Sequence, residues 1–358
     1  MNIWKLNNSI GDQPLNGDYI AGLVQADGSF SSRTIRKTRG NKSYIGLSNI
    51  FTLVQKQEYK ELILKIKQQL GDIGSWYISP KDKCIRYQIS KIDDLHNIVI
   101  PFFMKHHLRS GKLQSFLRFK YIVEVMYNKQ HRNNKNILLS LIVIASNMNP
   151  LGKLGNKIRY LDKSDINLVL ANKQPDGVDI SKLESEIQNF KVKPINAEFI
   201  NGLIDGDGSI TVCFAKGVIT NKTVVNLRFA IIQDIHNVTL LNEIKEFFNV
   251  GSVYPANPNY SIFNTKSYKD LAMQVFPKLN ININNIESNS MFDKNIPIIK
   301  RNKFIYSALI LEILINKKGS LNEDTLDKIF IYSYYVSQQW SKISIDNYIK
   351  DLKLRLKL

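Results

Sequence analysis

Two aspartates carry the most specific chemical signal in the chain, because each stands near the end of a segment that occurs twice. Asp27 lies in YIAGLVQADGSF (residues 19–30), and Asp207 lies in FINGLIDGDGSI (residues 199–210). A pair of carboxylates attracts a hard divalent cation such as Mg²⁺. A cation held there can orient a water molecule and stabilise a leaving oxygen, which is the chemistry of metal-assisted phosphodiester hydrolysis.

Each copy of the segment is predicted to form a short helix that ends at its aspartate. Asp18 in the first copy and Asn196 in the second can cap the helix start with a side-chain oxygen. Gly28 and Gly208 follow the aspartates directly. They are expected to end the helices in the left-handed backbone conformation that glycine accepts.

Small residues four positions apart leave one face of each predicted helix with little side-chain bulk. They are Gly22 and Ala26 in the first copy, and Gly202 and Gly206 in the second. Faces of this kind allow two helices to approach closely. Packing them side by side would bring the two aspartates together at the negative ends of both helix dipoles, where a cation is favoured.

The repetition continues downstream of the motif. Alternating residues predict a pair of strands after each copy, and an amphipathic helix after each pair. The strands are expected at residues 31–37, 45–54, 211–215 and 224–232, the first helices at 59–71 and 238–251, and later helices at 111–126 and 302–314. A repeat of this size indicates duplication of a whole domain.

The predicted fold is therefore α+β, with two pseudo-symmetric αββαββα-type domains packed through the motif helices. The first domain is expected at residues 1–171 and the second at residues 195–358. The intervening residues 172–194 are polar and carry a proline near each end, so they are interpreted as a linker with one short helix in its middle.

Charge narrows the class of partner. A formal net charge of +18 over 358 residues is more than solubility requires and points to an anionic partner. The most apolar stretch, residues 137–148, is too short to cross a bilayer and indicates a buried helix, so nucleic acid is favoured over a membrane. Cys84 and Cys213 lie far apart with no neighbouring Cys or His, which argues against a zinc site or a disulfide framework.

The duplicated motif resembles the signature of the LAGLIDADG homing endonucleases, specifically the single-chain, two-motif members that group I introns encode. The resemblance covers nearly the whole chain. It implies saddle-shaped antiparallel sheets that face DNA, and it implies that Asp27 and Asp207 bind the catalytic metals. The earlier acidic position of the motif is Asp205 in the second copy but Gln25 in the first. This departure leaves the metal carboxylates intact, so cleavage is expected to survive it.

The family also places a glutamine at the end of a strand near the active site and a lysine shortly before a long helix. The resemblance assigns these catalytic roles to Gln55, Gln233, Lys112 and Lys303. Such a lysine can offset the charge that develops on a phosphate, and such a glutamine can position water. Lys300 competes with Lys303, because the register before the second long helix is open. The alternative for all of them is a solvated surface side chain.

The strand after each aspartate should alternate between the core and a DNA-facing surface. In the first copy the outward, DNA-binding set is Ser31, Arg33, Ile35, Lys37 and Arg39. In the second copy it is Thr211 and Cys213, with Asn226 and Arg228 on the next strand. Arginine suits guanine edges, and all these side chains would lie near phosphates. The first set is the more cationic, so the two half-sites should differ; the alternative is a solvated edge hairpin.

A site-specific homing endonuclease that breaks both strands of a long asymmetric DNA target is the predicted function. An RNA-splicing maturase for a group I intron is the alternative, alone or combined with cleavage, and a non-catalytic DNA-binding regulator is a third. RNA binding alone gives no reason to keep both aspartates with their glutamine and lysine companions. The expected cofactor is Mg²⁺, or Ca²⁺ or Mn²⁺ in the same sites.

Double-stranded DNA is the expected partner, and group I intron RNA is a second candidate. A single chain with two motifs should act as a monomer, and no membrane association is expected. The N-terminus lacks the pattern of a secretory or organelle-targeting segment. A mitochondrial location is therefore expected to mean that the protein is encoded in the organelle.

Overall fold

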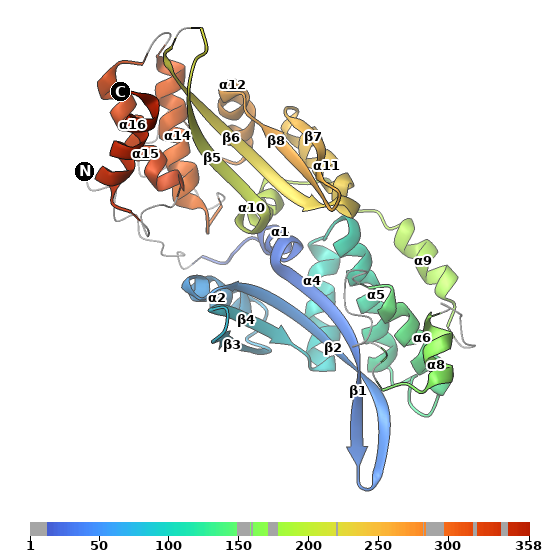
Figure 1. Cartoon of the computed structure of the whole chain (residues 1–358). Helices are drawn as coiled ribbons and strands as arrows, with labels where there is room; N and C mark the ends of the chain where they lie inside the picture. Colours follow the sequence, from blue (N-terminus) through green and yellow to red (C-terminus); the bar gives the residue numbers. More distant parts are fainter. Residues whose placement is uncertain are drawn as a thin grey trace. The chain divides into compact units, whose positions relative to one another are not determined.

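The computed structural model describes residues 13–148, 158, 160–170, 178–219, 221–281, 283, 297–317, 321–337 and 343–358. These residues form two compact units, with the division in the sequence between Pro194 and Ile195 (Figure 1). Each unit contains a four-stranded antiparallel sheet together with helices, so the α+β class predicted from the sequence is confirmed.

The first unit begins with the first motif helix and continues directly into its sheet. Its main elements are α1 (Gly17–Asp27), β1 (Gly28–Arg39), β2 (Lys42–Lys56), α2 (Lys60–Gln69), β3 (Ser75–Ser79), β4 (Cys84–Ile89), α4 (Ile100–Lys105), α5 (Ser110–Tyr127), α6 (Lys135–Ser146), α8 (Lys163–Leu170) and α9 (Ile180–Gln188). The strand order is β1-β2-β4-β3. Figure 1 shows the β1–β2 hairpin projecting beyond the other strands of its sheet.

The second unit repeats this order. Its main elements are α10 (Ala197–Asp207), β5 (Gly208–Lys216), β6 (Thr223–Asp234), α11 (Val238–Phe248), β7 (Ser252–Asn257), β8 (Tyr260–Thr265), α12 (Tyr268–Asp270), α13 (Phe276–Lys278), α14 (Arg301–Asn316), α15 (Glu323–Ser337) and α16 (Ile345–Leu356). The strand order β5-β6-β8-β7 matches that of the first unit. All four strands predicted to follow the motifs lie inside the observed strands.

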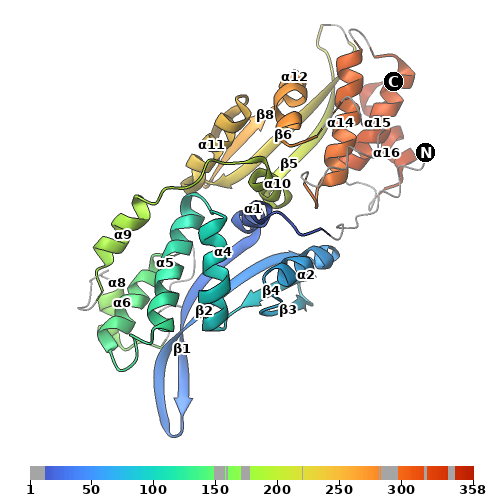
Figure 2. The ribbon, with the colours of Figure 1, turned by 180° about the vertical axis from the view of Figure 1, so that it is seen from behind.

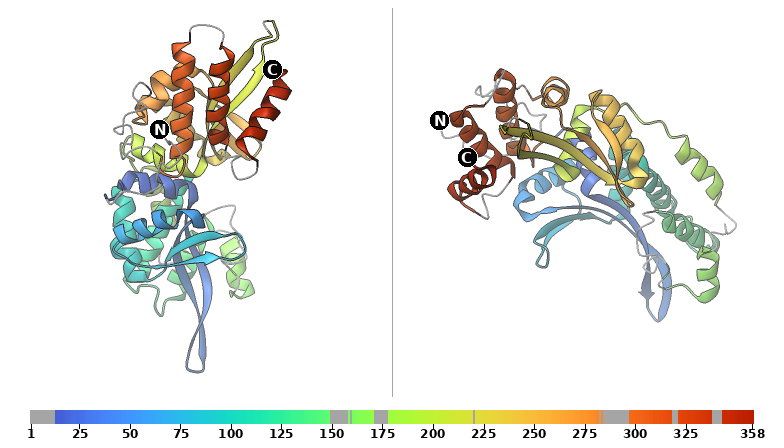
Figure 3. Two further views of the ribbon diagram at one scale, coloured as in Figure 1. Left: turned by 90° about the vertical axis from the view of Figure 1, so that its left-hand side faces the viewer. Right: turned by 45° about the horizontal axis from the view of Figure 1, so that its top comes forward.

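Helices cover one face of each sheet. In the first unit α5 packs on β1 and α2 packs on β2 and β4, and Figure 2 shows α4 and α5 on this side. In the second unit α14, α15 and α16 contact β5 (Figure 3). Aromatic rings fill the space between sheet and helices: Phe30, Phe51, Phe103, Phe116 and Phe119 in the first unit, and Phe229, Phe248, Phe263, Phe276 and Phe304 in the second.

The starts of the two motif helices confirm one predicted cap and correct the other. Asn196 Oδ1 accepts from Phe199 N at 2.9 Å, as predicted for α10. The cap of α1 is Asn16, whose Oδ1 accepts from Asp18 N at 2.8 Å, so the prediction of Asp18 was wrong. Asp18 lies in the first turn instead, where a carboxylate is favoured by the positive end of the helix dipole.

Gly28 and Gly208 end the motif helices in an extended conformation, with φ of −90° and −81°, so the predicted left-handed cap was wrong. Glycine is required there for space. A Cβ on Gly28 would lie 2.7 Å from the Val24 carbonyl oxygen, and a Cβ on Gly208 would lie 2.7 Å from Ile204 Cα. The chain folds back tightly against its own helix, so each strand begins at the residue after the aspartate.

Left-handed residues occur at the ends of the next two helices. Gly71, after α2, has φ of +79°, a conformation that glycine accepts readily. At the end of α11 the left-handed cap is Asn249, with φ of 57°, and Gly251 follows with φ of +86°. Asparagine tolerates this conformation better than most residues with a side chain.

The apolar segment predicted to be buried forms α6, where Leu141, Ile142, Val143 and Ile144 are fully buried. Among the described residues, no helix is both long enough and apolar enough to cross a membrane.

The described part of the expected linker carries the predicted short helix, α9, which is held against the first unit. Asp179 caps it by accepting from Lys182 N at 2.9 Å. Arg118 of α5 donates two hydrogen bonds to the Glu184 carboxylate, one from Nε at 2.8 Å and one from Nη2 at 2.5 Å. A bidentate arginine–carboxylate pair fixes orientation as well as distance, so α9 is a fixed part of the first unit's surface.

Candidate active site

In both units the motif aspartate is joined to the strand glutamine that the sequence predicted. Gln55 Nε2 donates to Asp27 Oδ2 at 2.6 Å, and Gln233 Nε2 donates to Asp207 Oδ2 at 2.6 Å. Both glutamines are buried, with 8% and 5% of their surface exposed. Each therefore holds the carboxylate of its own unit in one orientation at the junction of helix and strand.

Lysines from the start of the long helices reach the same junctions. Lys112 Nζ donates to the Gly28 carbonyl oxygen. In the second unit Lys300 Nζ donates to the Gly208 carbonyl oxygen at 2.6 Å, and also to those of Ile204 and Gly206 at 2.7 Å and 2.9 Å. A cation is favoured at the C-terminal end of a helix by the exposed carbonyl groups and by the dipole.

The contact with the glycine after the aspartate is what Lys112 and Lys300 share. Lys300 is the residue before α14, whereas Lys303 lies inside the first turn of that helix. The geometry therefore matches Lys112 with Lys300, the competitor of the residue that the sequence favoured. The match depends on how the backbone of residues 297–300 approaches α14, and this cannot be predicted from a local sequence pattern.

The earlier acidic position of the motif has a structural partner in both units. Asp205 is 3% exposed and its carboxylate accepts from Ile298 N at 2.7 Å and from Lys300 N at 2.9 Å. Gln25 is 2% exposed and its Oε1 accepts from Arg109 N at 2.9 Å. The motif pattern marks this position only as a departure in the first copy, whereas in the structure both residues bind the backbone of the segment that carries the lysine.

The atoms gathered at each helix end suit a hard cation. The aspartate carboxylate and the backbone carbonyl oxygen of the following glycine lie there, and oxygens of these kinds are ligands that Mg²⁺ and Ca²⁺ prefer. The glutamine presents its Nε2 to the carboxylate. Within the part of the chain that the structure describes, no cluster of three or more His, Cys, Asp or Glu side chains could hold a metal by itself. Asp27 and Asp207 each supply one carboxylate at the helix end of their own unit.

The outward face of the first sheet follows the predicted alternation. Arg33 is exposed and Ser31 and Ile35 are half-buried, while Ser32 and Thr34 between them are buried. Lys37 is also exposed, and the side chain of Arg39 lies outside the described residues. The prediction missed Arg36, which is exposed because β1 has by then passed the core; its guanidinium lies 5.7 Å from the ring centre of Tyr160.

Further polar residues continue this face across β2, β4 and the edge strand β3, and those on β2 and β4 were not predicted from the sequence. Thr52 pairs with Gln88, and Arg86 pairs with Tyr77 on the edge strand. Tyr77 is 47% exposed. The alternation of apolar and polar residues in the sequence of β4 would have identified Arg86 and Gln88 once that strand was assigned.

The second sheet presents a less cationic face. Thr211 pairs with Arg228, and Cys213 pairs with Asn226. Thr211, Cys213 and Asn226 are exposed. Arg228 is half-buried, and its Nε donates to Asn264 Oδ1 at 2.8 Å, so its guanidinium is held close to the sheet. The predicted surface residues of this unit thus share one face.

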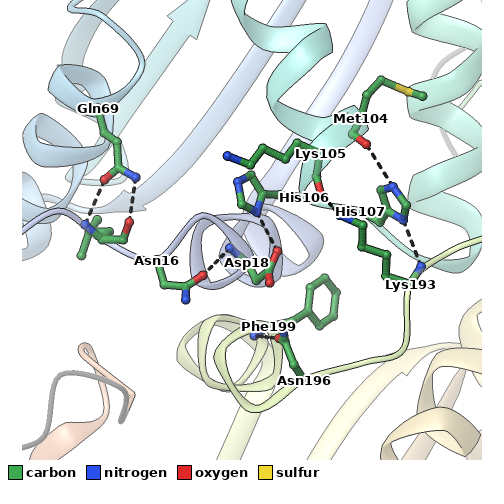
Figure 4. Close-up of polar contacts among 11 residues, drawn as sticks. Asn16, Asp18, Gln69, Met104, Lys105, His106, His107, Lys193, Asn196 and Phe199 are labelled. Atoms are coloured by element: carbon green, nitrogen blue, oxygen red, sulfur yellow. Dashed lines mark hydrogen bonds and ion pairs between the residues drawn. The ribbon is translucent and has the colours of Figure 1, made fainter.

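Two histidines near the start of α1 have protein partners (Figure 4). His106 Nδ1 lies 2.7 Å from Asp18 Oδ1. His107 Nδ1 accepts from Lys193 N at 3.1 Å, and its Nε2 lies 3.0 Å from the Met104 carbonyl oxygen. Since an amide N–H only donates and a carbonyl only accepts, His107 is neutral with its hydrogen on Nε2. Burial lowers the pKa of His107 further.

Comparison with known protein families supports the duplicated site. The family model described as LAGLIDADG endonuclease matches residues 20–123 and 200–290, one region around each motif. The chain belongs to the LAGLIDADG endonuclease family. The recognition made from the motifs and the assignment to DNA endonucleases are therefore confirmed.

Curated relatives of this LAGLIDADG endonuclease come from fungi. The probable intron-encoded DNA endonuclease 1 of Mycosarcoma maydis is 27% identical over 264 residues, which cover 74% of this chain and 92% of that protein. The probable intron-encoded endonuclease 2 of Neurospora crassa is 27% identical over 274 residues, covering 74% of this chain but 55% of that protein. Both are named as products of introns.

Solved structures share the fold. The LAGLIDADG homing endonuclease I-LtrWI, bound to target DNA, has a TM-score of 0.72 and 25% identity, with 89% of this chain and 96% of that chain covered. I-SmaMI, bound to an uncleaved DNA target in the presence of calcium ions, has a TM-score of 0.70 and 20% identity, with 89% and 98% covered.

Proposed function

We propose that this LAGLIDADG endonuclease is a site-specific homing endonuclease that breaks both strands of a long, asymmetric DNA target. The observation that carries this proposal is the duplicated set of aspartate, glutamine and lysine at the ends of α1 and α10. A fold alone does not imply a function, but at this site one such set for each strand of a duplex supports cleavage of both strands. The complex of I-LtrWI with target DNA supports the same substrate.

In each unit the carboxylate of the motif aspartate, Asp27 or Asp207, is proposed to hold divalent metal. When bound, such a metal supplies Lewis-acid stabilisation of the phosphate and lowers the pKa of a bound water.

Mg²⁺ is the proposed cofactor, with Ca²⁺ or Mn²⁺ able to occupy the same sites. The hard carboxylate oxygens of Asp27 and Asp207 support a hard cation. The calcium ions named with I-SmaMI support divalent metal at this fold.

The residues around each aspartate have proposed roles of their own. Gln55 and Gln233 hold the carboxylates and would orient water. Lys112 and Lys300 would each offset the negative charge that develops on one phosphate, because both are anchored at the glycine that follows the aspartate. Lys303 is not assigned this role.

Recognition is proposed to differ between the two half-sites. The cationic face of β1, centred on Arg33, suits guanine edges and phosphates, whereas the face of β5 and β6 presents Thr211, Cys213 and Asn226. One chain that carries both faces would act as a monomer. The intron-encoded fungal relatives support a gene of the same kind, and a mitochondrial, organelle-encoded origin is the proposal for this chain.

A selection from DNA tests the proposal. The purified protein would be incubated with Mg²⁺ and a duplex library that contains candidate intron-free insertion sites, and the cut ends would be sequenced. We expect double-strand cuts at one site, lost when EDTA replaces the metal. Binding of one sequence without metal-dependent cutting would overturn the endonuclease and leave the splicing maturase or the DNA-binding regulator. The matched controls are Asp27→Asn and Asp207→Asn.

A further inference from the structure

A buried polar side chain, two residues before each catalytic aspartate, binds the backbone of the segment that carries the lysine. These side chains are Gln25 in the first unit and Asp205 in the second. Both lie on the motif helix and both are almost fully buried, so neither is placed to touch a substrate directly. Their hydrogen bonds connect the motif helix to the segment just before the long helix, which is α5 in the first unit and α14 in the second.

Asp205 fixes Lys300 from its backbone. One carboxylate oxygen accepts from Ile298 N and the other from Lys300 N. The ammonium of the same lysine bonds to the carbonyl oxygens at the end of α10, including that of Gly208. The helix therefore holds Lys300 at both ends, through a charged acceptor at the backbone and through carbonyl groups at the ammonium.

Gln25 makes a weaker version of this anchor. Its Oε1 accepts from Arg109 N, and the Arg109 carbonyl in turn accepts from Leu113 N to begin α5, whose first turn carries Lys112. Its Nε2 is buried without a hydrogen-bond partner, whereas both oxygens of Asp205 accept. Hydrogen bonds to a charged acceptor are roughly twice as strong as neutral ones.

We propose that Gln25 and Asp205 are positioning residues for Lys112 and Lys300, and that their difference makes the two DNA strands break at unequal rates. The inference rests on the proposed endonuclease function, with each lysine acting on one strand. A small misplacement of a catalytic group costs a large factor in rate. The strand served by Lys300, which has the charged and fully bonded anchor, is cut first.

Strand-resolved kinetics test this inference. The target found by selection would carry a different label on each strand, and single-turnover rates would be measured for the wild type, Gln25→Ala and Asp205→Asn. We expect Asp205→Asn to slow one strand by about 10-fold to 100-fold, as for other residues that orient a catalytic group. Gln25→Ala should slow the opposite strand, and each variant should cut its other strand within about 2-fold of the wild-type rate. That unaffected strand shows that the variant is folded.

The lysines supply a second criterion. If Asp205 acts through Lys300, Asp205→Asn should add little to Lys300→Ala in a double-mutant cycle, and the same should hold for Gln25→Ala with Lys112→Ala. Asp205→Gln introduces the residue type found at the equivalent position of the first unit, and it should retain more activity than Asp205→Ala. The comparison of these two variants tests the role of Asp205 if Asp205→Asn folds poorly.

Equal slowing of both strands, or additive effects in both cycles, would overturn the positioning role. Equal rates on the two strands in the wild type would overturn the predicted asymmetry. A wild type that binds but never cuts would instead remove the proposed function, so the two failures are distinguishable.

Discussion

The two units share their catalytic ends and differ in the surfaces beyond them. Each aspartate accepts from its glutamine at the same distance, 2.6 Å, and the strand order of both sheets is the same. By contrast, β1 runs for 12 residues with exposed Arg33 and Lys37, whereas β5 runs for 9 residues with exposed Thr211 and Cys213. The difference teaches that duplication preserved the geometry needed for hydrolysis and left the recognising residues free to diverge.

The largest expected effect tests the catalytic residues that the two units share. Asp27→Asn and Asp207→Asn should each lower double-strand cutting by about 10³-fold or more, because losing a metal carboxylate removes several kcal/mol of transition-state stabilisation. Cutting rates with saturating Mg²⁺ would measure it, with binding of uncut target as the folding control. If one variant retained near wild-type cutting, the two ends would not be equivalent.

The lysines give the next largest effect and sharpen the match between the units. Lys112→Ala and Lys300→Ala should each lower the rate on one strand by ~10²-fold, as for loss of one donor to a developing oxyanion. Lys303→Ala, the matched control three residues further on, should change it by less than about 3-fold. A larger loss in Lys303→Ala than in Lys300→Ala would restore the residue that the sequence favoured.

The glutamines should have a smaller effect of equal size in both units. Gln55→Ala and Gln233→Ala leave the carboxylates in place but remove the bond that orients them, which typically costs about 10-fold to 100-fold. A titration of cutting against Mg²⁺ concentration would show a raised requirement for metal in both variants. Unequal effects of the two substitutions would show that the two units also differ at their catalytic residues.

The diverged surfaces should respond differently to the same change. Arg33→Ala should weaken binding by roughly 1–3 kcal/mol if Arg33 reads a guanine, and should relax the preference for one base pair. Thr211→Ala should produce a smaller loss at the equivalent position of the other half-site. Binding to a panel of single-base variants of the target would measure both, and equal losses would contradict the asymmetry of the two faces.

The smallest expected effect concerns His107, which accepts from Lys193 N near the end of the first unit. Since His107 has a lowered pKa in the folded protein, its neutral form is favoured by folding. Its contribution to stability is therefore present above the ordinary histidine pKa of about 6.5 and is lost as the pH falls through the folded pKa. A melting temperature that falls between pH 7 and pH 5 should fall less in His107→Gln. An unchanged pH dependence would exclude His107 as a contributor.

Patterns repeated along the chain predicted much of the site. Alternating residues located β1, β2, β5 and β6, because strand faces depend on neighbouring residues. The roles of Gln55 and Gln233 came from the family resemblance, and the structure pairs each with the aspartate of its unit.

Features set by the path of the backbone could not be predicted in this way. Gly28 is required by contact with the preceding helical turn rather than by its own φ, and that contact exists only after the chain has folded back. The choice of Lys300 depends on two backbone bonds to Asp205 from the segment before α14. The docking of α9 depends on Arg118, which lies 66 residues before its partner Glu184.

The direct passage from helix to strand at Asp27 and Gly28 restricts how a new target could be acquired. Because β1 begins at the residue after the carboxylate, inserting or deleting one residue in it would exchange its inward and outward side chains. Variation in length is then tolerated only at the distal turn, residues 40–41, far from the phosphate to be cut. A new DNA target must therefore be acquired by substitution of individual outward side chains, while the length of the strand stays the same.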